Sequence, residues 1–291
     1  MTLSQWLDQY LELVKTTPSY STKKSQCAHL KRLLGHLPLA EVSKVRIMEY
    51  KNLRGAECLV RHGKKIEGKK IKGATVNGEV SCLLAALNLA ADPSVGLCEA
   101  PPRVKKEREM ARAKTITDAQ YKALLDCSER WLQRIIIAAN ESAIDRGVLL
   151  RLTWDYVHDG LIALDRDKTG VEQRVGISPA LSEVLNELRA EYRKIPNTGK
   201  LVFTRAGKAI PKATLRYAFD KAVSDAKVEG FQLRDFRHVA RTRWADAGLP
   251  FEVAEKGMGH KIRGVSGVYI NLSNTQIKRR CLPGRKMLTW C

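Results

Sequence analysis

The sequence predicts two domains: an all-α N-terminal domain, and a mainly α C-terminal domain with a small β-sheet, which makes the second domain α+β. Three observations predict this fold class. A chain of 291 residues is long enough for roughly two domains. Apolar residues recur every three or four positions over most of the chain, which indicates amphipathic helices. Two short apolar segments joined by a polar turn in the second half are typical of paired strands.

The chain is strongly basic. Lys and Arg number 51 and Asp and Glu number 31, which gives a net charge of +20. Such an excess indicates a polyanionic partner. A hydrophobic fraction of 44% is enough for an ordinary core and excludes wholesale disorder. The N-terminus lacks the pattern of a signal peptide, and no apolar run approaches the roughly 18 residues of a membrane span. We therefore expect a cytoplasmic protein with no membrane partner.

The cysteines predict reduced thiols and not a metal site. The chain has seven of them, no two at C-x-x-C spacing, and its six histidines do not cluster with them. We therefore expect no metal and no cofactor. Any chemistry has to come from ordinary side chains.

The first domain is predicted to span residues 1–100. Four amphipathic helices are expected, at residues 3–14, from 21 or 22 to 35, from 45 to 50 and from 75 to 91. The segment RHGKKIEGKKIKG (residues 61–73) has dense positive charge and no periodic apolar face. It predicts an exposed basic loop or hairpin that contacts phosphates.

Residues 101–114 are predicted to be a basic inter-domain linker, because Pro101 and Pro102 break structure before the run RVKKEREMARAK. A basic connector suits a two-domain clamp around a duplex. The side chains predicted to contact DNA are Lys23, Lys24, Lys31, Arg32, Arg61, Lys64, Lys65, Lys69, Lys70, Thr75, Asn77, Arg103, Lys105 and Lys106. Thr75 and Asn77 are the candidates for base-edge contacts. Those on the helices are equally compatible with an ordinary solvated surface.

The second domain is predicted over residues 115–291. Thr117 and Gln120 have the spacing of a capping box, which predicts a helix start. Further helices are expected at residues 131–139 and 149–157, and from 179, 212, 232 and 251 onward. Short strands are expected at residues 161–164, 171–177 and 201–203.

Chemically informative side chains concentrate in residues 232–271. This segment holds five closely spaced basic groups, then a histidine and a tyrosine: Arg234, Arg237, His238, Arg241, Arg243, His260 and Tyr269. Arginine forks bind phosphate oxygens bidentately. A tyrosine phenol can attack a phosphoryl centre if the developing charge is neutralised. The residue types therefore suit phosphoryl transfer to a phenol.

The spacing of these groups resembles that of the tyrosine recombinases, the phage integrase family. The family pattern is H-x-x-R-H, then A-G, then L-G-H, then a tyrosine. It corresponds without a gap to R-D-F-R-H (234–238), Ala247-Gly248, M-G-H (258–260) and Tyr269. Upstream, D-K-T-G (167–170) resembles the β-hairpin lysine motif of the family, with Lys168 as its lysine. Residues 138–157 resemble the motif of the first arginine. The helices of residues 1–91 resemble the core-binding domain more loosely.

Two positions depart from the family pattern. Counted back from Trp154 without a gap, the first arginine of the family falls on Asp145. Either a one-residue slip lets Arg146 serve, which we favour because a loop can absorb it, or the site is altered. Arg234 stands where the family has histidine. Arginine can donate hydrogen bonds to a phosphate but cannot accept a proton near neutral pH.

The resemblance implies a site-specific DNA recombinase or integrase. Tyr269 attacks the scissile phosphate and forms a 3′-phosphotyrosyl link, while Arg146, Arg234 and Arg237 bind the phosphate. Lys168 protonates the leaving 5′-oxygen. His260 hydrogen-bonds the phosphate or helps to deprotonate the tyrosine.

The resemblance also implies an assembly. Family members act as homotetramers on two double-stranded recombination sites and exchange strands through a Holliday junction. Residues 272–291 then dock as a tail on the neighbouring protomer, and an accessory DNA-bending protein is compatible with this scheme. The protein is expected to be nucleoid-associated when bound to DNA.

Two other functions stay open from the sequence. A DNA-binding protein of the same fold that has lost cleavage is motivated by Asp145 and Arg234. A type IB-like topoisomerase would relax DNA without choosing a site.

Overall fold

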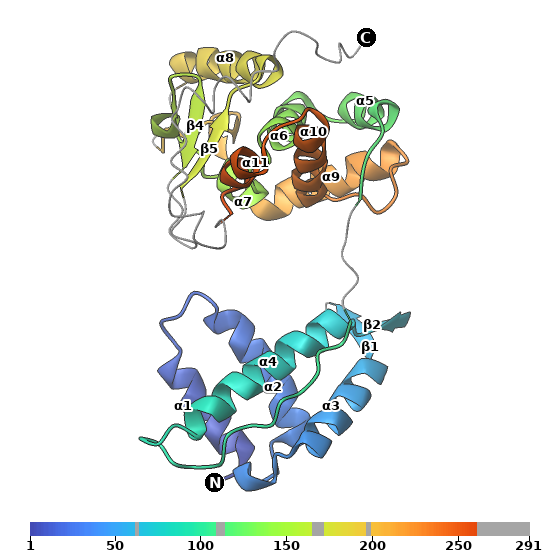
Figure 1. The fold of residues 1–291 in the computed structure, drawn as a ribbon. Coiled ribbons are helices and arrows are strands. Elements are labelled where there is room, and N and C mark those ends of the chain that lie inside the picture. Colours follow the sequence, from blue (N-terminus) through green and yellow to red (C-terminus); the bar gives the residue numbers. More distant parts are fainter. Residues whose placement is uncertain (62–63, 109–113, 165–171, 196–198, 261–291) are drawn as a thin grey trace. The chain divides into compact units, whose positions relative to one another are not determined.

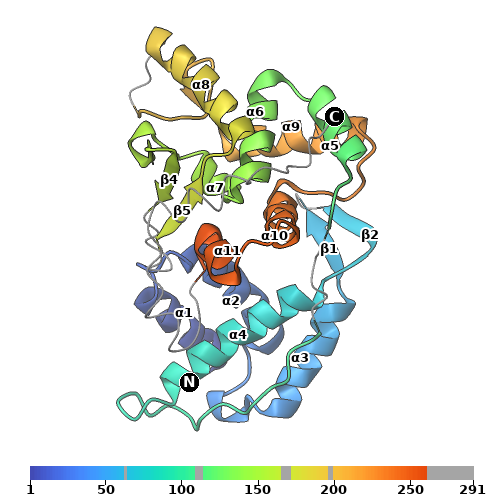
Figure 2. The ribbon, with the colours of Figure 1, turned by 45° about the horizontal axis from the view of Figure 1, so that its top comes forward.

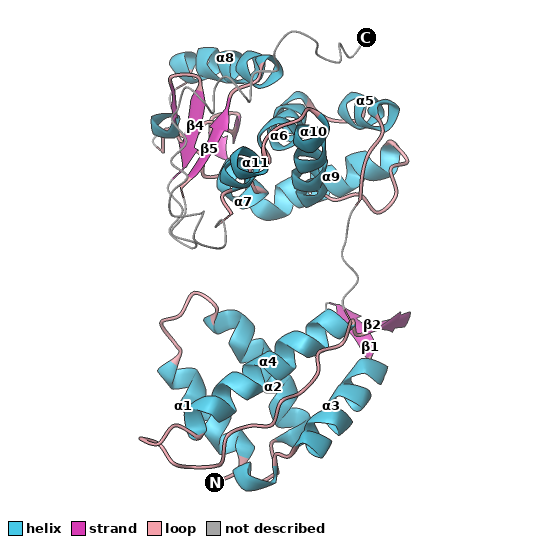
Figure 3. Cartoon of the chain, viewed as in Figure 1, coloured by secondary structure: helices cyan, strands magenta, loops and turns pink. Residues whose placement is uncertain are grey.

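The computed structural model describes residues 1–61, 64–108, 114–164, 172–195 and 199–260 (Figure 1). The chain divides into two compact units, Met1–Ala111 and Arg112–Cys291. Helices dominate both units, and the strands form small antiparallel sheets (Figure 3). The predicted fold class, mainly α with a small sheet and a helical N-terminal part, is confirmed. No helix in the described ranges is both long enough and apolar enough to cross a membrane.

The first unit is built on a set of amphipathic helices. They are α1 (Leu3–Leu13), α2 (Tyr20–Leu34), the 3-10 turn η1 (Leu39–Glu41), α3 (Lys44–Ala56) and α4 (Gly73–Ala90). Thr2 and Gln5 form a capping box that starts α1. The indole nitrogen of Trp6 donates to the carbonyl of Ala86 at 2.8 Å, which ties α1 to α4 inside the core. The four helices expected from apolar periodicity are confirmed, with α2 beginning slightly earlier than expected.

The basic segment between α3 and α4 is a β-hairpin. β1 (Cys58–Arg61) pairs antiparallel with β2 (Lys64–Lys70). Of the two alternatives that the sequence left open, loop or hairpin, the structure shows the hairpin. It adds one small sheet to a unit that is otherwise helical.

A buried ion pair joins α3 to α4. Nε and Nη2 of Arg54 donate to the carboxylate of Glu79 at 2.9–3.1 Å, and the two residues are only 4% and 2% exposed. The hydroxyl of Tyr50 donates to the same carboxylate at 2.7 Å. Burial, together with this hydrogen bond, raises the pKa of the Tyr50 phenol. A further contact runs from Nη1 of Arg54 to Glu57 at 2.6 Å.

Part of the segment predicted as a linker packs against the first unit. Nζ of Lys51 on α3 donates to the carbonyl of Lys105 at 2.8 Å and pairs with the Glu107 carboxylate at 2.7 Å. The side chain of Val104 packs against the hydrophobic core. Residues 103–107 are therefore held along the helices of this unit.

The second unit contains helices around a small sheet. In chain order the helical elements are α5 (Asp118–Asp126), α6 (Arg130–Ser142), α7 (Arg146–Leu149), η2 (Trp154–Tyr156), α8 (Pro179–Lys194), α9 (Lys212–Asp225), η3 (Leu233–Asp235), α10 (Phe236–Asp246) and α11 (Phe251–Met258). Thr117 and Gln120 form the predicted capping box at the start of α5. The core centres on α6, α8 and α9, with Phe236 of α10 fully buried against Phe219 and Phe231.

The three-stranded sheet has the order β3-β4-β5 and is antiparallel. Its strands are β3 (Val157–His158), β4 (Leu161–Leu164) and β5 (Gln173–Gly176), and a second small pair is formed by β6 (Thr204–Arg205) and β7 (Lys208–Ala209). Leu164 pairs with Gln173 at the end of the β4–β5 ladder. The two strands predicted on either side of the D-K-T-G motif are confirmed, while Lys168 itself lies outside the described residues.

The prediction of a helix over residues 149–157 was wrong. α7 ends at Leu149, and the chain then forms backbone hydrogen bonds with residues 200–202. The amide of Trp154 donates to the carbonyl of Lys200 at 3.0 Å, and the amide of Val202 donates to the carbonyl of Leu152 at 2.8 Å. This pairing between distant segments overrides the local helical pattern.

Candidate active site

Arg237 holds together three parts of the second unit. From the first turn of α10, its Nη1 donates to the carbonyl of Ala143 at 2.8 Å, just after α6. Its Nη2 donates to the carbonyl of Met258, at the end of α11, and lies 3.1 Å from Nε2 of His260. Figure 2 shows α10 and α11 next to each other. The guanidinium of Arg237 therefore lies where α6, α10 and α11 meet.

His260 is brought to Arg237 by the way α11 ends. Gly259 has a left-handed backbone, φ 63°, and the amide of His260 donates to the carbonyl of Glu255 at 3.0 Å. Gly257 allows the close approach of α10, since a Cβ there would lie only 3.1 Å from the Trp244 ring. Gly257 thus lets α10 and α11 pack closely, and Gly259 turns His260 back toward α10.

The imidazole of His260 has a second partner. Nδ1 lies 2.9 Å from Oε2 of Glu255, one turn back on α11. Oε1 of the same carboxylate accepts from Nε of Arg241 at 3.3 Å, and the Arg241 guanidinium also lies over the ring of Phe251. A chain of charged and polar groups therefore runs from Arg237 through His260 and Glu255 to Arg241.

The turn before α7 differs from the expectation for Arg146. Asp145, at the N-cap position of α7, faces Arg237: its Oδ2 lies 3.8 Å from Nη1. Arg146 is the first residue of α7 and is exposed. We expected a one-residue slip to place Arg146 beside Arg237; in the structure Arg146 opens α7 directly after Asp145. Among the described residues Asp145 is therefore the one of the two that pairs with Arg237, and the phosphate contact expected of Arg146 stays a prediction.

The other predicted catalytic residues fall into two groups. Arg234 lies in η3, one turn before Arg237, and its side chain is exposed. The neighbouring Asp235 is fully buried and accepts from the amide of Gln232 at 2.8 Å, which fixes the start of α10. Lys168 and Tyr269 lie outside the described residues. The structure thus brings Arg237 and His260 together. Arg234, three residues before Arg237, has an exposed side chain.

Two side chains of the site were missed by the sequence analysis. Gln173 of β5 is fully buried, and its amide donates to the carbonyl of Gly257 at 2.6 Å, which fixes α11 against the sheet. Glu255 contacts His260, as described above. The five-residue spacing of Glu255 and His260 was the only sequence signal for their contact. That spacing predicts a contact only if Gly259 is known to turn the chain.

The flanking basic residues serve the fold. Nη1 of Arg243 pairs with Glu141 at 2.9 Å and Nη2 donates to the carbonyl of Asn140 at 2.8 Å, tying α10 to α6. Together with the Arg241–Glu255 pair, these contacts give both arginines a structural role.

The predicted DNA-contacting residues of the first unit occupy different environments. Exposed side chains without an ion pair among the described residues are Lys24, Lys64, Lys65, Lys69, Lys70, Thr75, Arg103, Lys105 and Lys106. Lys31 pairs with Asp8, and Arg32 pairs with Glu57 at 2.6 Å. Nζ of Lys23 lies 5.6 Å from the centre of the Tyr10 ring. The side chain of Arg61 is not among those described.

Asn77 does not fit the expectation of a base-edge contact. Its side chain is buried, with the residue 4% exposed. Its amide donates to the carbonyl of Glu107 at 2.9 Å and its oxygen accepts from the Glu107 amide at 2.8 Å. Because both ends of the amide are occupied by backbone, Asn77 anchors the segment after α4. The base-edge prediction rested on the position of Asn77 near the start of α4. That position alone does not reveal that tertiary packing buries the side chain.

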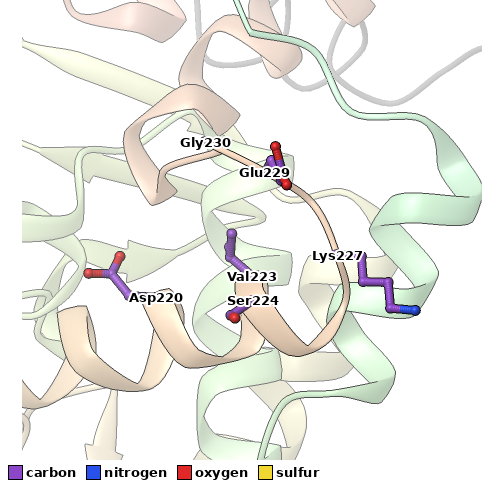
Figure 4. Close-up of a pocket in the computed structure, with 6 residues that line it drawn as sticks. All are labelled: Asp220, Val223, Ser224, Lys227, Glu229 and Gly230. Atoms are coloured by element: carbon purple, nitrogen blue, oxygen red, sulfur yellow. The ribbon is translucent and has the colours of Figure 1, made fainter.

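A surface pocket elsewhere in the second unit lies at the end of α9 (Figure 4). Its lining residues are Asp220, Val223, Ser224, Lys227, Glu229 and Gly230. None of them belongs to the Arg237–His260 group, and both charge signs are present. The pocket therefore adds nothing to the candidate site.

An arginine fork beside a histidine, in a strongly basic chain, is a set of groups suited to bind a phosphate. Residues 114–276, more than half of the chain, match the phage integrase family. The chain belongs to this family. It is 25% identical over 266 residues to a shufflon-specific DNA recombinase from Escherichia coli, covering 85% of this chain. It spans 63% of the length of that relative.

Solved structures share the fold. A lambda integrase dimer bound to a COC′ core site superposes with a TM-score of 0.72 at 18% identity, covering 90% of this chain and 96% of that one. A lambda integrase tetramer bound to a Holliday junction gives 0.71 at 17% identity, covering 99% and 79%. The Tn1549 transposon integrase with circular intermediate DNA gives 0.66 at 14% identity, covering 96% and 98%.

Proposed function

We propose that the chain is a site-specific DNA recombinase that cleaves and rejoins strands through a covalent 3′-phosphotyrosyl intermediate. The observation that carries the proposal is the contact between Arg237 and His260, 3.1 Å apart, in a chain of the phage integrase family. The net charge of +20 supports a nucleic-acid partner.

In the proposed reaction, Oη of Tyr269 attacks the scissile phosphorus. The bond from phosphorus to the 5′-oxygen breaks, and Lys168 supplies the proton to that oxygen. Arg237, with Arg146 and Arg234, neutralises charge on the non-bridging oxygens, and His260 binds the phosphate or accepts the tyrosine proton. Attack by a 5′-hydroxyl reverses the step, so the phosphotyrosine conserves the bond energy and no ATP is required.

The assembly follows as a further part of the proposal. Two recombination sites and four protomers exchange strands through a Holliday junction, with residues 272–291 docking on the neighbouring protomer. A solved structure contains a lambda integrase tetramer bound to a Holliday junction, and we extend that assembly to this chain. An accessory DNA-bending protein is compatible with it. We place the protein in the cytoplasm, on the nucleoid when bound to DNA.

A nicked suicide substrate that carries the recombination site tests the proposal. Loss of the short fragment next to the nick traps the covalent product. We expect a protein–DNA adduct with the wild-type chain and none with Tyr269→Phe, which lacks only the attacking oxygen. Absence of the adduct in wild-type protein that binds the same DNA would contradict cleavage. Relaxation of plasmids without regard to sequence would instead support a type IB-like topoisomerase.

One observation favours a second function, a DNA-binding protein of the same fold that does not cleave. The carboxylate of Asp145 lies 3.8 Å from the guanidinium of Arg237. A negative charge at this position repels a phosphate that binds to Arg237. Site-specific binding without an adduct on the suicide substrate is the result that this function predicts. The same experiment therefore decides between the two.

The hairpin lysines are expected to contact the phosphate backbone. Lys65 and Lys69 on β2 are exposed, and changing both to glutamine removes two charges without disturbing the core. The slope of log affinity against log salt should fall by about two, with equal weakening on specific and random DNA. Changing Lys194 and Lys208, two exposed lysines of the other unit, to glutamine is the charge-matched control. An unchanged slope in the hairpin variant would remove the hairpin from the interface.

A further inference from the structure

His260 is held at both ring nitrogens. Nε2 lies 3.1 Å from Nη2 of Arg237, and Nδ1 lies 2.9 Å from Oε2 of Glu255. The side chain of Glu255 is 17% exposed, whereas that of His260 is 48% exposed. A largely buried carboxylate therefore anchors one edge of an imidazole whose other side is open to solvent.

The two partners determine which nitrogen of the neutral ring carries the proton. Guanidinium groups only donate hydrogen bonds, so Nε2 has to accept from Arg237. An ionised carboxylate only accepts, so Nδ1 has to donate to Glu255. The contacts therefore select the Nδ1–H tautomer, with the lone pair of Nε2 directed toward the guanidinium. This is the form that can accept a proton at Nε2.

We propose that Glu255 is a positioning residue for His260: it fixes the ring orientation and the Nδ1–H tautomer, so that Nε2 keeps its lone pair on the side of the ring that faces Arg237. In the reaction, the guanidinium of Arg237 turns its donor from Nε2 to the phosphate, the phenol proton of Tyr269 passes to the lone pair thus freed on Nε2, and the carboxylate of Glu255 balances the charge of the resulting imidazolium. The consequence for the reaction rests on the proposed function, but the state of the ring can be measured without DNA.

Glu255 also has a structural contact that has to be separated from this role. Its Oε1 accepts from Nε of Arg241 at 3.3 Å and so links α11 to α10. Arg241→Gln weakens that link and leaves the contact between Glu255 and His260 in place. Glu252→Gln, in the first turn of the same helix, is the control for loss of a carboxylate elsewhere on α11.

The first measurement is nitrogen NMR of the His260 ring in the free full-length protein, assigned by comparison with His260→Asn. We expect the Nδ1–H tautomer in wild-type protein and in the Arg241→Gln and Glu252→Gln variants. Glu255→Ala should shift the ring toward the Nε2–H tautomer. Glu255→Gln should largely keep the wild-type tautomer, because its amide oxygen accepts the same hydrogen bond.

The second measurement is single-turnover adduct formation on the suicide substrate. Glu255→Ala should lower the rate by about 10- to 100-fold at unchanged DNA affinity, with partial recovery in Glu255→Gln. A wild-type tautomer in Glu255→Ala, or an equal loss of rate in Arg241→Gln, overturns the positioning role. If wild-type protein forms no adduct, the proposed function fails, and the tautomer alone decides whether Glu255 positions the ring.

Discussion

Replacing Glu79 with alanine is expected to destabilise the first unit by about 3 kcal/mol or more, because it leaves a buried guanidinium without its main partner. Arg54 is 4% exposed and directs Nε and Nη2 to the Glu79 carboxylate. The hydroxyl of Tyr50 loses its acceptor in the same variant. The remaining contact of Arg54 with Glu57 involves a carboxylate that is 30% exposed, which compensates only in part.

Hydrogen exchange of the α3 and α4 peptides measures this effect in the full chain, where a single unfolding transition cannot be assumed. Glu12→Ala is the matched control, since its pair with Lys15 is exposed on both sides and should contribute about 0.5 kcal/mol or less. The double change Arg54→Met with Glu79→Leu should recover part of the loss, because it removes both buried charges. Equal protection in Glu79→Ala and Glu12→Ala would show that the buried pair contributes little.

The helices were predictable because their signal is local. Apolar spacing and the Thr117–Gln120 capping box depend only on neighbours within a few turns, and both appear as expected. The failure at residues 149–157 has the opposite cause. The chain there pairs with residues 200–202, and no pattern within the segment announces that partner.

The candidate site shows the same division. The approach of Arg237 and His260 was expected from motif spacing, and the structure places them 3.1 Å apart. Of the carboxylates that contact these two groups, Asp145 was one of two alternatives left open by the sequence, whereas Glu255 was not foreseen. Glu255 reaches His260 only because Gly259 turns the chain, and Asp145 faces Arg237 only because α7 starts at Arg146. Such contacts depend on backbone geometry at two or three residues, which residue types alone do not fix.

Arg237→Lys is expected to lower the rate of adduct formation by about 10²- to 10³-fold, the size of effect seen when one preorganised donor to a transition state is lost. Lysine keeps the charge, but its single ammonium cannot reproduce the planar fork. In this structure that fork spans the carbonyls of Ala143 and Met258 and the ring of His260. The variant therefore tests geometry and not charge.

Arg243→Lys supplies the matched control, because Arg243 lies on the same helix and also forks to the end of α6, through Glu141 and the carbonyl of Asn140. It has no contact with His260 among the described residues. If Arg237 acts on the phosphate, Arg243→Lys should cost stability while leaving the single-turnover rate within about threefold of wild type. An equal loss of rate in both variants would mean that the fork serves to hold α10 against α6. The catalytic charge would then have to come from Arg146 or Arg234, whose side chains are already exposed.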